Sequence, residues 1–171
     1  MRLFIAINFN SGTKAGLISL RDDLRACSKR GNFSVPENLH LTLVFLGECD
    51  VKQAAAVKTA MDAVVSGPFY ISIEQIGRFR AGGGDIWWAG ANGGKELLEL
   101  QRDLTGMLTE AGFKLEKRKY SPHITLGREV VTDKSPRELE PFGETVSSIE
   151  LMKSERISGK LTYTAIHQKR F

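Results

Sequence analysis

The order of hydrophobic and polar residues predicts alternating strands and helices in the first part of the chain. Residues 2–9 alternate loosely and predict a strand, and the apolar run at 39–46 predicts another. Residues 13–30 and the alanine-rich segment 52–66 have helical spacing instead. The apolar stripe of the first of these helices consists of Leu17, Leu20, Leu24 and Cys27. This stripe predicts a helix packed on a sheet.

The second part of the chain contains one clear helix between groups of strands. The helix is predicted from Lys95 to Ala111, and Gly112 suits the left-handed conformation that often ends a helix. A glycine-rich link at 82–84 is expected to join two antiparallel strands. The strands predicted in this part are residues 69–79, 85–90, 123–130, 145–153 and 161–168, with a polar stretch from Thr132 to Glu144.

The order of these elements favours an α+β fold. Strands and amphipathic helices alternate, but the last two strands follow each other without a helix, which argues against a doubly wound parallel sheet. The length of 171 residues fits a single domain, residues 1–171, or two closely packed lobes that share one core. We expect one domain made of two interleaved lobes.

Composition and charge limit the classes of partner. A net charge of +4 is compatible with a phosphate-bearing ligand, but it is too small for indiscriminate binding of nucleic acid. Cys27 and Cys49 do not form a metal-binding pair and are expected to be reduced, as in a cytoplasmic protein. The opening MRLFIAINF predicts a first strand and not a signal peptide, and no apolar run is long enough for a membrane span.

One four-residue pattern occurs twice in the chain. HLTL begins at His40 and HITL begins at His123, each in a run with strand character, and the chain has only three histidines. Residues i and i+2 of a strand point to one face, so each histidine projects beside its threonine, Thr42 or Thr125. The apolar residues between them anchor the other face. Two such strands facing each other would place two imidazoles and two hydroxyls around one cavity.

This set of groups suits acid–base catalysis at a phosphodiester. A neutral histidine can take a proton from the attacking oxygen while a protonated histidine gives one to the leaving oxygen. The hydroxyls can donate hydrogen bonds to the non-bridging phosphate oxygens. The scheme requires neither a metal nor a cofactor, and neither is expected. The structural alternative is that both pairs are half-buried polar residues that bond to the backbone.

Two longer stretches, HLTLVFLG and SPHITLGR, resemble the paired motifs of the 2H phosphoesterase family. The opening RLFIAI and the segment RKYSPHITLGR are similar to one branch of it, the RNA 2′,3′-cyclic phosphodiesterases, also called 2′-5′ RNA ligases. The resemblance implies a bilobal fold of two pseudo-symmetric antiparallel sheets, with helices outside and the active-site cleft between the lobes. It also implies hydrolysis of RNA 2′,3′-cyclic phosphate ends to 2′-phosphomonoesters, and it leaves open a reversible 2′-5′ ligation.

The roles of individual residues follow from the resemblance alone. It makes His40 the general acid, which protonates the departing 3′ oxygen, and His123 the general base, which activates water. Thr42 and Thr125 would hold the phosphate.

Two arginines, Arg118 and Arg128, fall on arginines of the family pattern and are expected to help bind the substrate. Arg128 lies five residues after His123, so strand parity places it on the opposite face, and a role in the cleft needs a twist, a bulge or a strand end. Lys119 and Tyr120 depart from the family pattern just before the second motif.

The remaining aromatic and histidine residues have simpler interpretations. Trp87 and Trp88 are neighbours in a predicted strand and face opposite ways, so one is expected in the core while the other could stack on a base. Phe45 lies on the apolar face of its strand and is expected in the core. His167 lacks a threonine partner and is expected to be a surface or structural residue.

The sequence is also compatible with two other functions. A phosphodiesterase with the same site could act on a small cyclic nucleotide or on an ADP-ribose cyclic phosphate. A protein of another class, a non-catalytic module that binds RNA ends, would keep the site without turnover. Under the leading hypothesis the partner is an RNA end carrying a 2′,3′-cyclic phosphate, with no membrane partner, and the protein is expected to be a monomer.

Overall fold

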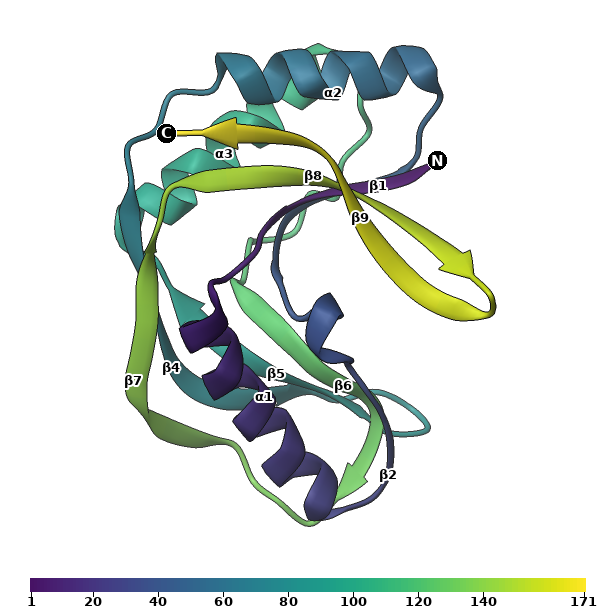
Figure 1. Ribbon diagram of the computed structural model, residues 1–171, viewed down its shortest axis with the longest axis vertical. Helices are drawn as coiled ribbons and strands as arrows, with labels where there is room; N and C mark the ends of the chain where they lie inside the picture. Colours follow the sequence, from purple (N-terminus) through teal and green to yellow (C-terminus); the bar gives the residue numbers. More distant parts are fainter.

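A computed structural model describes residues 1–171, and Figure 1 shows the arrangement of its elements. The helices are α1 (Ser11–Ala26), α2 (Val51–Ala63) and α3 (Gly94–Glu110), with a short 3-10 turn at Pro36–Asn38. The strands are β1 (Arg2–Ile7), β2 (Ser28–Phe33), β3 (Leu41–Glu48), β4 (Phe69–Phe79), β5 (Asp85–Asn92), β6 (His123–Thr132), β7 (Arg137–Val146), β8 (Ser148–Ile157) and β9 (Lys160–Arg170).

The strands form two antiparallel sheets. The smaller sheet has four strands in the order β3-β1-β8-β9, and the larger has five in the order β2-β6-β5-β4-β7. The first histidine motif lies at β3 of the smaller sheet, and the second lies in β6 of the larger sheet. Each sheet therefore contributes one motif.

Helices α1 and α2 connect the two sheets along the chain, and α3 packs against strands of both. Helix α1 follows β1 of the smaller sheet but packs against β2, β6 and β7 of the larger one. Helix α3 lies between β5 and β6 in the chain, yet it packs against β3 as well as β4, and α2 packs against α3 and β9. In Figure 1, α1 lies over the larger sheet, while α2 and α3 lie beside the smaller one. One hydrophobic cluster of 34 buried residues includes residues from both sheets.

The predicted helices form where the apolar stripes indicated them. The side chain of Asn10 accepts a hydrogen bond from the Thr13 N–H at 2.9 Å and caps α1, and Asp50 and Gln53 form a capping box at the start of α2. Gly112 follows α3 with φ of 95°, the left-handed conformation expected there. The buried faces of α1 and α3 include Leu17, Leu20, Leu24, Leu97, Leu100, Leu104 and Leu108.

Two segments differ from the sequence-based prediction. The first helix ends at Ala26, and residues 28–33 form strand β2. The polar stretch after Thr132 mostly forms strand β7, which ends at Val146, so the predicted strand 145–153 is divided between β7 and β8. β2 and β7 are the two edge strands of the larger sheet, and most of their side chains are exposed or half-buried. Such strands need no strong hydrophobic alternation, which is why the pattern did not predict them.

Candidate active site

His40 lies at the entrance to β3, directly after the Pro36–Asn38 turn and Leu39. Its Nδ1 lies 2.7 Å from the carbonyl oxygen of Asn38, and its Nε2 lies 2.9 Å from Oγ1 of Thr42. A carbonyl oxygen only accepts, so Nδ1 carries the proton and Nε2 of the neutral ring is an acceptor. The Thr42 hydroxyl therefore donates to Nε2. The two polar side chains of the first motif lie together, as the strand spacing predicts.

His123 is the first residue of β6 and is held in the same way. Its Nδ1–H donates to the carbonyl oxygen of Ser121 at 2.6 Å, again two residues earlier in the chain. This bond leaves Nε2 as the acceptor of the neutral ring, and no protein group bonds to that atom. Both imidazoles thus have their tautomer fixed by a backbone carbonyl, with Nε2 of His123 free and Nε2 of His40 bonded only to the Thr42 hydroxyl.

Each histidine is packed between two aromatic rings. The ring of His40 lies 4.9 Å from Phe4 and 5.2 Å from Tyr163, between ring centroids. The ring of His123 lies 5.1 Å from Phe79, edge to face, and 6.2 Å from Trp88. These contacts restrict both imidazoles to one orientation and remove them partly from water.

Both motif strands contain a bulge just after the threonine. In β3, Thr42 pairs with Ala6 and Val44 pairs with Ile5, so Leu43 is the extra residue. In β6, Thr125 pairs with Trp88 and Gly127 pairs with Trp87, so Leu126 is the extra residue. An extra residue reverses the side-chain parity of the strand beyond it. The fifth residue after each histidine, Phe45 or Arg128, is therefore returned to the face of the histidine. For Phe45 this contradicts the expected core position, because the residue is 63% exposed.

The two motifs are joined through Tyr120. Its hydroxyl donates a hydrogen bond to the carbonyl oxygen of Thr42 at 2.8 Å, and β3 packs against β6. Burial raises the pKa of the Tyr120 hydroxyl, so the group stays protonated and remains a donor. Tyr120, one of the two residues that depart from the family pattern, thus connects the segment before β6 to the first motif.

The pKa of His40 is lowered to about 4, mainly because burial disfavours the charged ring. The hydrogen bond to Asn38 raises this pKa, and the positive charges of Lys14 and Arg128 and of a protonated His123 lower it. A positive charge on His123 therefore lowers the pKa of His40, although the two motifs belong to different sheets. His40 is neutral at pH 7 in the free protein.

The pKa of His123 is also lowered, first by burial. The hydrogen bond to Ser121 raises it, and the charges of Arg128 and Arg118 lower it. Arg128 acts on both imidazoles, so a positive charge stands near both halves of the site.

A sequence model of the 2′-5′ RNA ligase superfamily matches residues 7–157 of this chain. The chain belongs to this superfamily. The RNA 2′,3′-cyclic phosphodiesterase of Archaeoglobus fulgidus is 33% identical over 130 residues, which are 75% of this chain and 72% of that protein. The protein of the same name from Methanothermobacter thermautotrophicus is 29% identical and covers 88% of this chain and 80% of its own length. The resemblance read from the paired motifs is confirmed.

Solved structures show the same fold. A protein of Thermus thermophilus superposes with a TM-score of 0.86 at 24% identity, covering 99% of this chain and 97% of that one. LigT of E. coli, in its complex with 3′-AMP, superposes with a TM-score of 0.85 at 22% identity and the same coverage. The predicted α+β fold of two antiparallel sheets with helices packed on them is confirmed.

The two arginines named from the superfamily pattern lie in different environments. Arg128 is exposed and, beyond the β6 bulge, its charge also lowers the pKa of Tyr163, which is raised overall by burial. Arg118 lies in the segment before β6, is 80% exposed, and forms an ion pair with Glu116 at 2.9 Å. Its charge reaches His123 but is not among the causes that shift the pKa of His40. Arg128 therefore acts on both histidines, whereas Arg118 acts on His123 alone.

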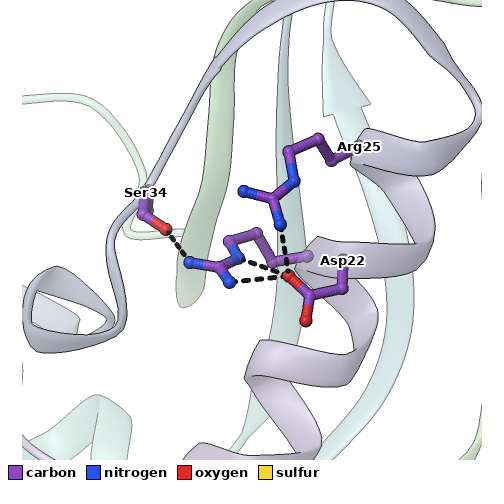
Figure 2. A network of polar contacts seen from close by, with 4 residues as sticks. Asp22, Arg25 and Ser34 are labelled. Carbon is purple, nitrogen blue, oxygen red and sulfur yellow. Dashed lines mark hydrogen bonds and ion pairs between the residues drawn. The ribbon is translucent and has the colours of Figure 1, made fainter.

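Figure 2 shows part of a polar network that the sequence did not reveal, around Asp22, Arg25 and Ser34. The buried Arg21 of α1 donates to the carbonyl oxygen of Ser34 at 3.0 Å and also bonds to Asp22. The Ser34 hydroxyl donates to the carbonyl oxygen of Thr125 at 2.9 Å, and its N–H donates to that of Leu126 at the bulge. The network connects α1 to the backbone that carries the second threonine.

Sequence reasoning also missed the other neighbours of the histidines. Lys14, Phe4, Phe79 and Tyr163 come from four separate elements, and no motif joins them. His167 lies outside the site, where its Nε2 bonds to Asp62 at 2.7 Å and connects β9 to α2. Hence its predicted structural role agrees with its position.

The structure contains no group of three His, Cys, Asp or Glu side chains arranged to hold a metal ion. None of its helices combines the length and apolarity that a membrane crossing requires.

Proposed function

We propose that this protein hydrolyses RNA 2′,3′-cyclic phosphate ends to 2′-phosphomonoesters, with His40 as the proton donor and His123 as the proton acceptor. The observation that carries the proposal is that the two imidazoles are held in the same tautomer by equivalent hydrogen bonds. Each donates Nδ1–H to a carbonyl oxygen two residues earlier, which leaves Nε2 of His123 free and Nε2 of His40 bonded only to the Thr42 hydroxyl. The names of its relatives, RNA 2′,3′-cyclic phosphodiesterases, support the same substrate.

The proposed reaction is an in-line displacement at phosphorus. Nε2 of neutral His123 takes a proton from water, the water oxygen forms a bond to phosphorus, and the bond from phosphorus to the 3′ oxygen breaks. Protonated His40 gives its proton to that 3′ oxygen, which leaves the phosphate on the 2′ oxygen. His123 suits the acceptor role because its Nε2 has no partner in the free protein.

The phosphate would be bound by hydroxyls and by positive charge. The hydroxyls of Thr42 and Thr125 would donate to the non-bridging oxygens, and Thr42 already lies within hydrogen-bond distance of Nε2 of His40. Arg128, with Arg118 farther out, would supply the positive charge. The bound anion would raise the depressed pKa of His40 and favour the protonated ring that the reaction needs.

We further propose that the protein acts as a monomer in the cytoplasm. Both motifs belong to the same fold and are joined by the hydrogen bond from Tyr120 to Thr42, which supports a site that needs no second copy. Cys27 is exposed and Cys49 is buried, and the two are not paired, which supports a reducing compartment.

The proposal is tested with a defined oligonucleotide that ends in a 2′,3′-cyclic phosphate, in buffer containing EDTA. His40→Ala and His123→Ala should each lower the rate of ring opening by about 10² to 10⁴. His167→Ala removes the third histidine, which lies outside the site, and should leave the rate unchanged. The product should carry its phosphate on the 2′ oxygen. Full activity in either motif variant would contradict the mechanism, and tight binding without turnover would point to an RNA-end-binding module.

A further inference from the structure

A groove of about 460 Å³ lies on the larger sheet, next to the second motif. Its volume is within the range of about 300–1,000 Å³ that is usual for sites of small molecules. Strands β4, β5 and β7 and the segment before β6 line it. None of the residues given a role above lies on its wall except Ser121, which positions His123, and Trp88, which packs beside it.

The groove opens directly beside His123. The carbonyl oxygen of Ser121 fixes the His123 ring, and Gly90 is the cross-strand partner of His123. The centroid of the Trp88 ring lies 6.2 Å from that of the imidazole. A ligand whose phosphate reaches the two histidines can therefore place its next group in the groove.

Trp88 lies across the sheet and forms a flat wall of the groove. The benzo part of its ring covers Gly77 of β4, and a Cβ atom at that position would overlap the ring. A Cβ at Gly90 would lie 3.2 Å from the same ring. The two glycines thus allow the indole to lie over neighbouring strands. Trp87 points the opposite way and is buried in the core, with 1% of its surface exposed.

The charge of the groove is opposite to that at the histidines. Its wall contains the carboxylates of Glu74 and Glu138 and no lysine, arginine or histidine. The side chains of Gln75 and Glu138 have no hydrogen-bond or ion-pair partner in the protein, and the side chain of Glu74 has only a long contact, 3.5 Å, with Asn92. The groove therefore repels a phosphate and leaves acceptor groups free for a neutral ligand. Positive charge acts instead on the histidines.

We propose that this groove binds a nucleobase of the substrate, stacked on Trp88, and that it prefers bases with an exocyclic amino group. The inference rests on the proposed function, because that function places the phosphate at the histidines. A carboxylate only accepts hydrogen bonds, so it can pair with the amino group of adenine, cytosine or guanine and disfavours the carbonyl oxygens of uracil. The base can belong to the nucleotide with the cyclic phosphate or to the nucleotide before it.

Kinetics with small substrates test this preference. The 2′,3′-cyclic monophosphates of adenosine, cytidine and uridine are compared with dinucleotides that carry the same ends. We expect Trp88→Ala to raise KM by about tenfold, and Trp88→Phe to restore most of the loss. Tyr70→Ala removes an exposed aromatic of the same β4 strand outside the groove and should leave KM unchanged. An effect on the mononucleotides assigns the groove to the terminal base, and an effect on the dinucleotides alone assigns it to the preceding base.

Glu138→Gln tests the amino-group preference without removing the platform. The exposed carboxylate becomes an amide that can also donate, so the cytidine-over-uridine ratio of kcat/KM should fall by about tenfold, as expected for a hydrogen bond to a charged group. An unchanged ratio overturns the preference.

Fluorescence separates this inference from the hydrolysis itself. Adenosine should quench the tryptophan emission of the wild-type protein, and Trp88→Phe, which keeps Trp87, should abolish the quenching. Quenching in a protein that does not hydrolyse cyclic phosphates would overturn the proposed function and retain the nucleobase site. Hydrolysis with no quenching, and with KM indifferent to Trp88→Ala, would overturn the nucleobase site and retain the proposed function.

Discussion

The hydroxyl of Ser34 donates a hydrogen bond to the carbonyl oxygen of Thr125 at 2.9 Å. Ser34→Ala removes this donor and leaves the Thr125 carbonyl without its side-chain partner, beside the β6 bulge. We expect a loss of about 1 kcal/mol in the free energy of unfolding. We also expect kcat to fall several-fold with little change in KM, because the second threonine is held less firmly.

Denaturant unfolding and steady-state kinetics measure the two effects of Ser34→Ala. Ser28→Ala is the matched control, since its hydroxyl donates to the carbonyl oxygen of Leu24 at 2.6 Å, away from the motifs. The control should lose comparable stability and keep its kcat. Equal kcat losses in both variants would exclude a positioning role for Ser34.

Tyr120→Phe tests the bond between the two halves of the site. The change keeps the ring and removes the hydroxyl that donates to the Thr42 carbonyl. We expect a loss of about 1 kcal/mol in stability and a lower kcat. Tyr70→Phe removes a hydroxyl from an exposed tyrosine and should alter neither quantity. A Tyr120→Phe protein with unchanged stability and kcat would refute the role of this bond.

Arg128→Gln should change both substrate binding and the pH profile. Removal of the charge should raise KM by about tenfold, since a charged donor to phosphate is lost. The same charge lowers the pKa of His40 and His123, so both values should rise. The rate constant kcat/KM falls at high pH, where the last histidine proton is lost, and this limb of the profile should move to higher pH.

The control for Arg128→Gln is Arg102→Gln, at an exposed arginine that pairs with Asp103 on α3. It should leave KM and the pH profile unchanged. An Arg128→Gln profile that coincides with the wild type would show that this arginine does not act on the histidines.

The depressed pKa of His40 makes stability depend on pH. The folded value is about 4 and the ordinary value is 6.5, so the unfolded chain takes up a proton first as pH falls. The contribution is fully present above pH 6.5 and is lost between pH 6.5 and 4, by at most about 3 kcal/mol. Unfolding free energies at pH 7 and pH 4 should differ less in His40→Gln than in the wild type. His167→Gln should keep the wild-type difference, and an undiminished drop in His40→Gln would refute the assignment.

Much of the site followed from the sequence because its two motifs use the simple geometry of a strand. A spacing of two residues places His40 beside Thr42, and the same rule holds at His123 and Thr125. The helices followed from their leucine stripes. Edge strands β2 and β7 did not, because an edge strand needs no apolar face.

The bulges explain why strand parity failed beyond the motifs. Counting from His40 puts Phe45 in the core, and counting from His123 puts Arg128 on the wrong face. One extra residue in each strand, Leu43 or Leu126, reverses both conclusions. The bulge depends on partner strands that lie far away in the chain, so the local pattern does not reveal it. The same distance in sequence hid Tyr120 and Ser34, whose bonds reach Thr42 and Thr125.

The packing of α1 and α3 has a consequence for how the molecule unfolds, because α1 follows a strand of one sheet and covers the other, and α3 contacts both sheets. Strand β1 lies between β3 and β8 in one sheet, while the helix that follows it covers the other sheet. Detachment of α1 or α3 from a sheet would expose apolar residues of the common hydrophobic cluster. The whole chain should therefore unfold in one cooperative transition. Both histidines should gain or lose their surroundings together, so no stable intermediate should keep one of the two motifs in its native environment.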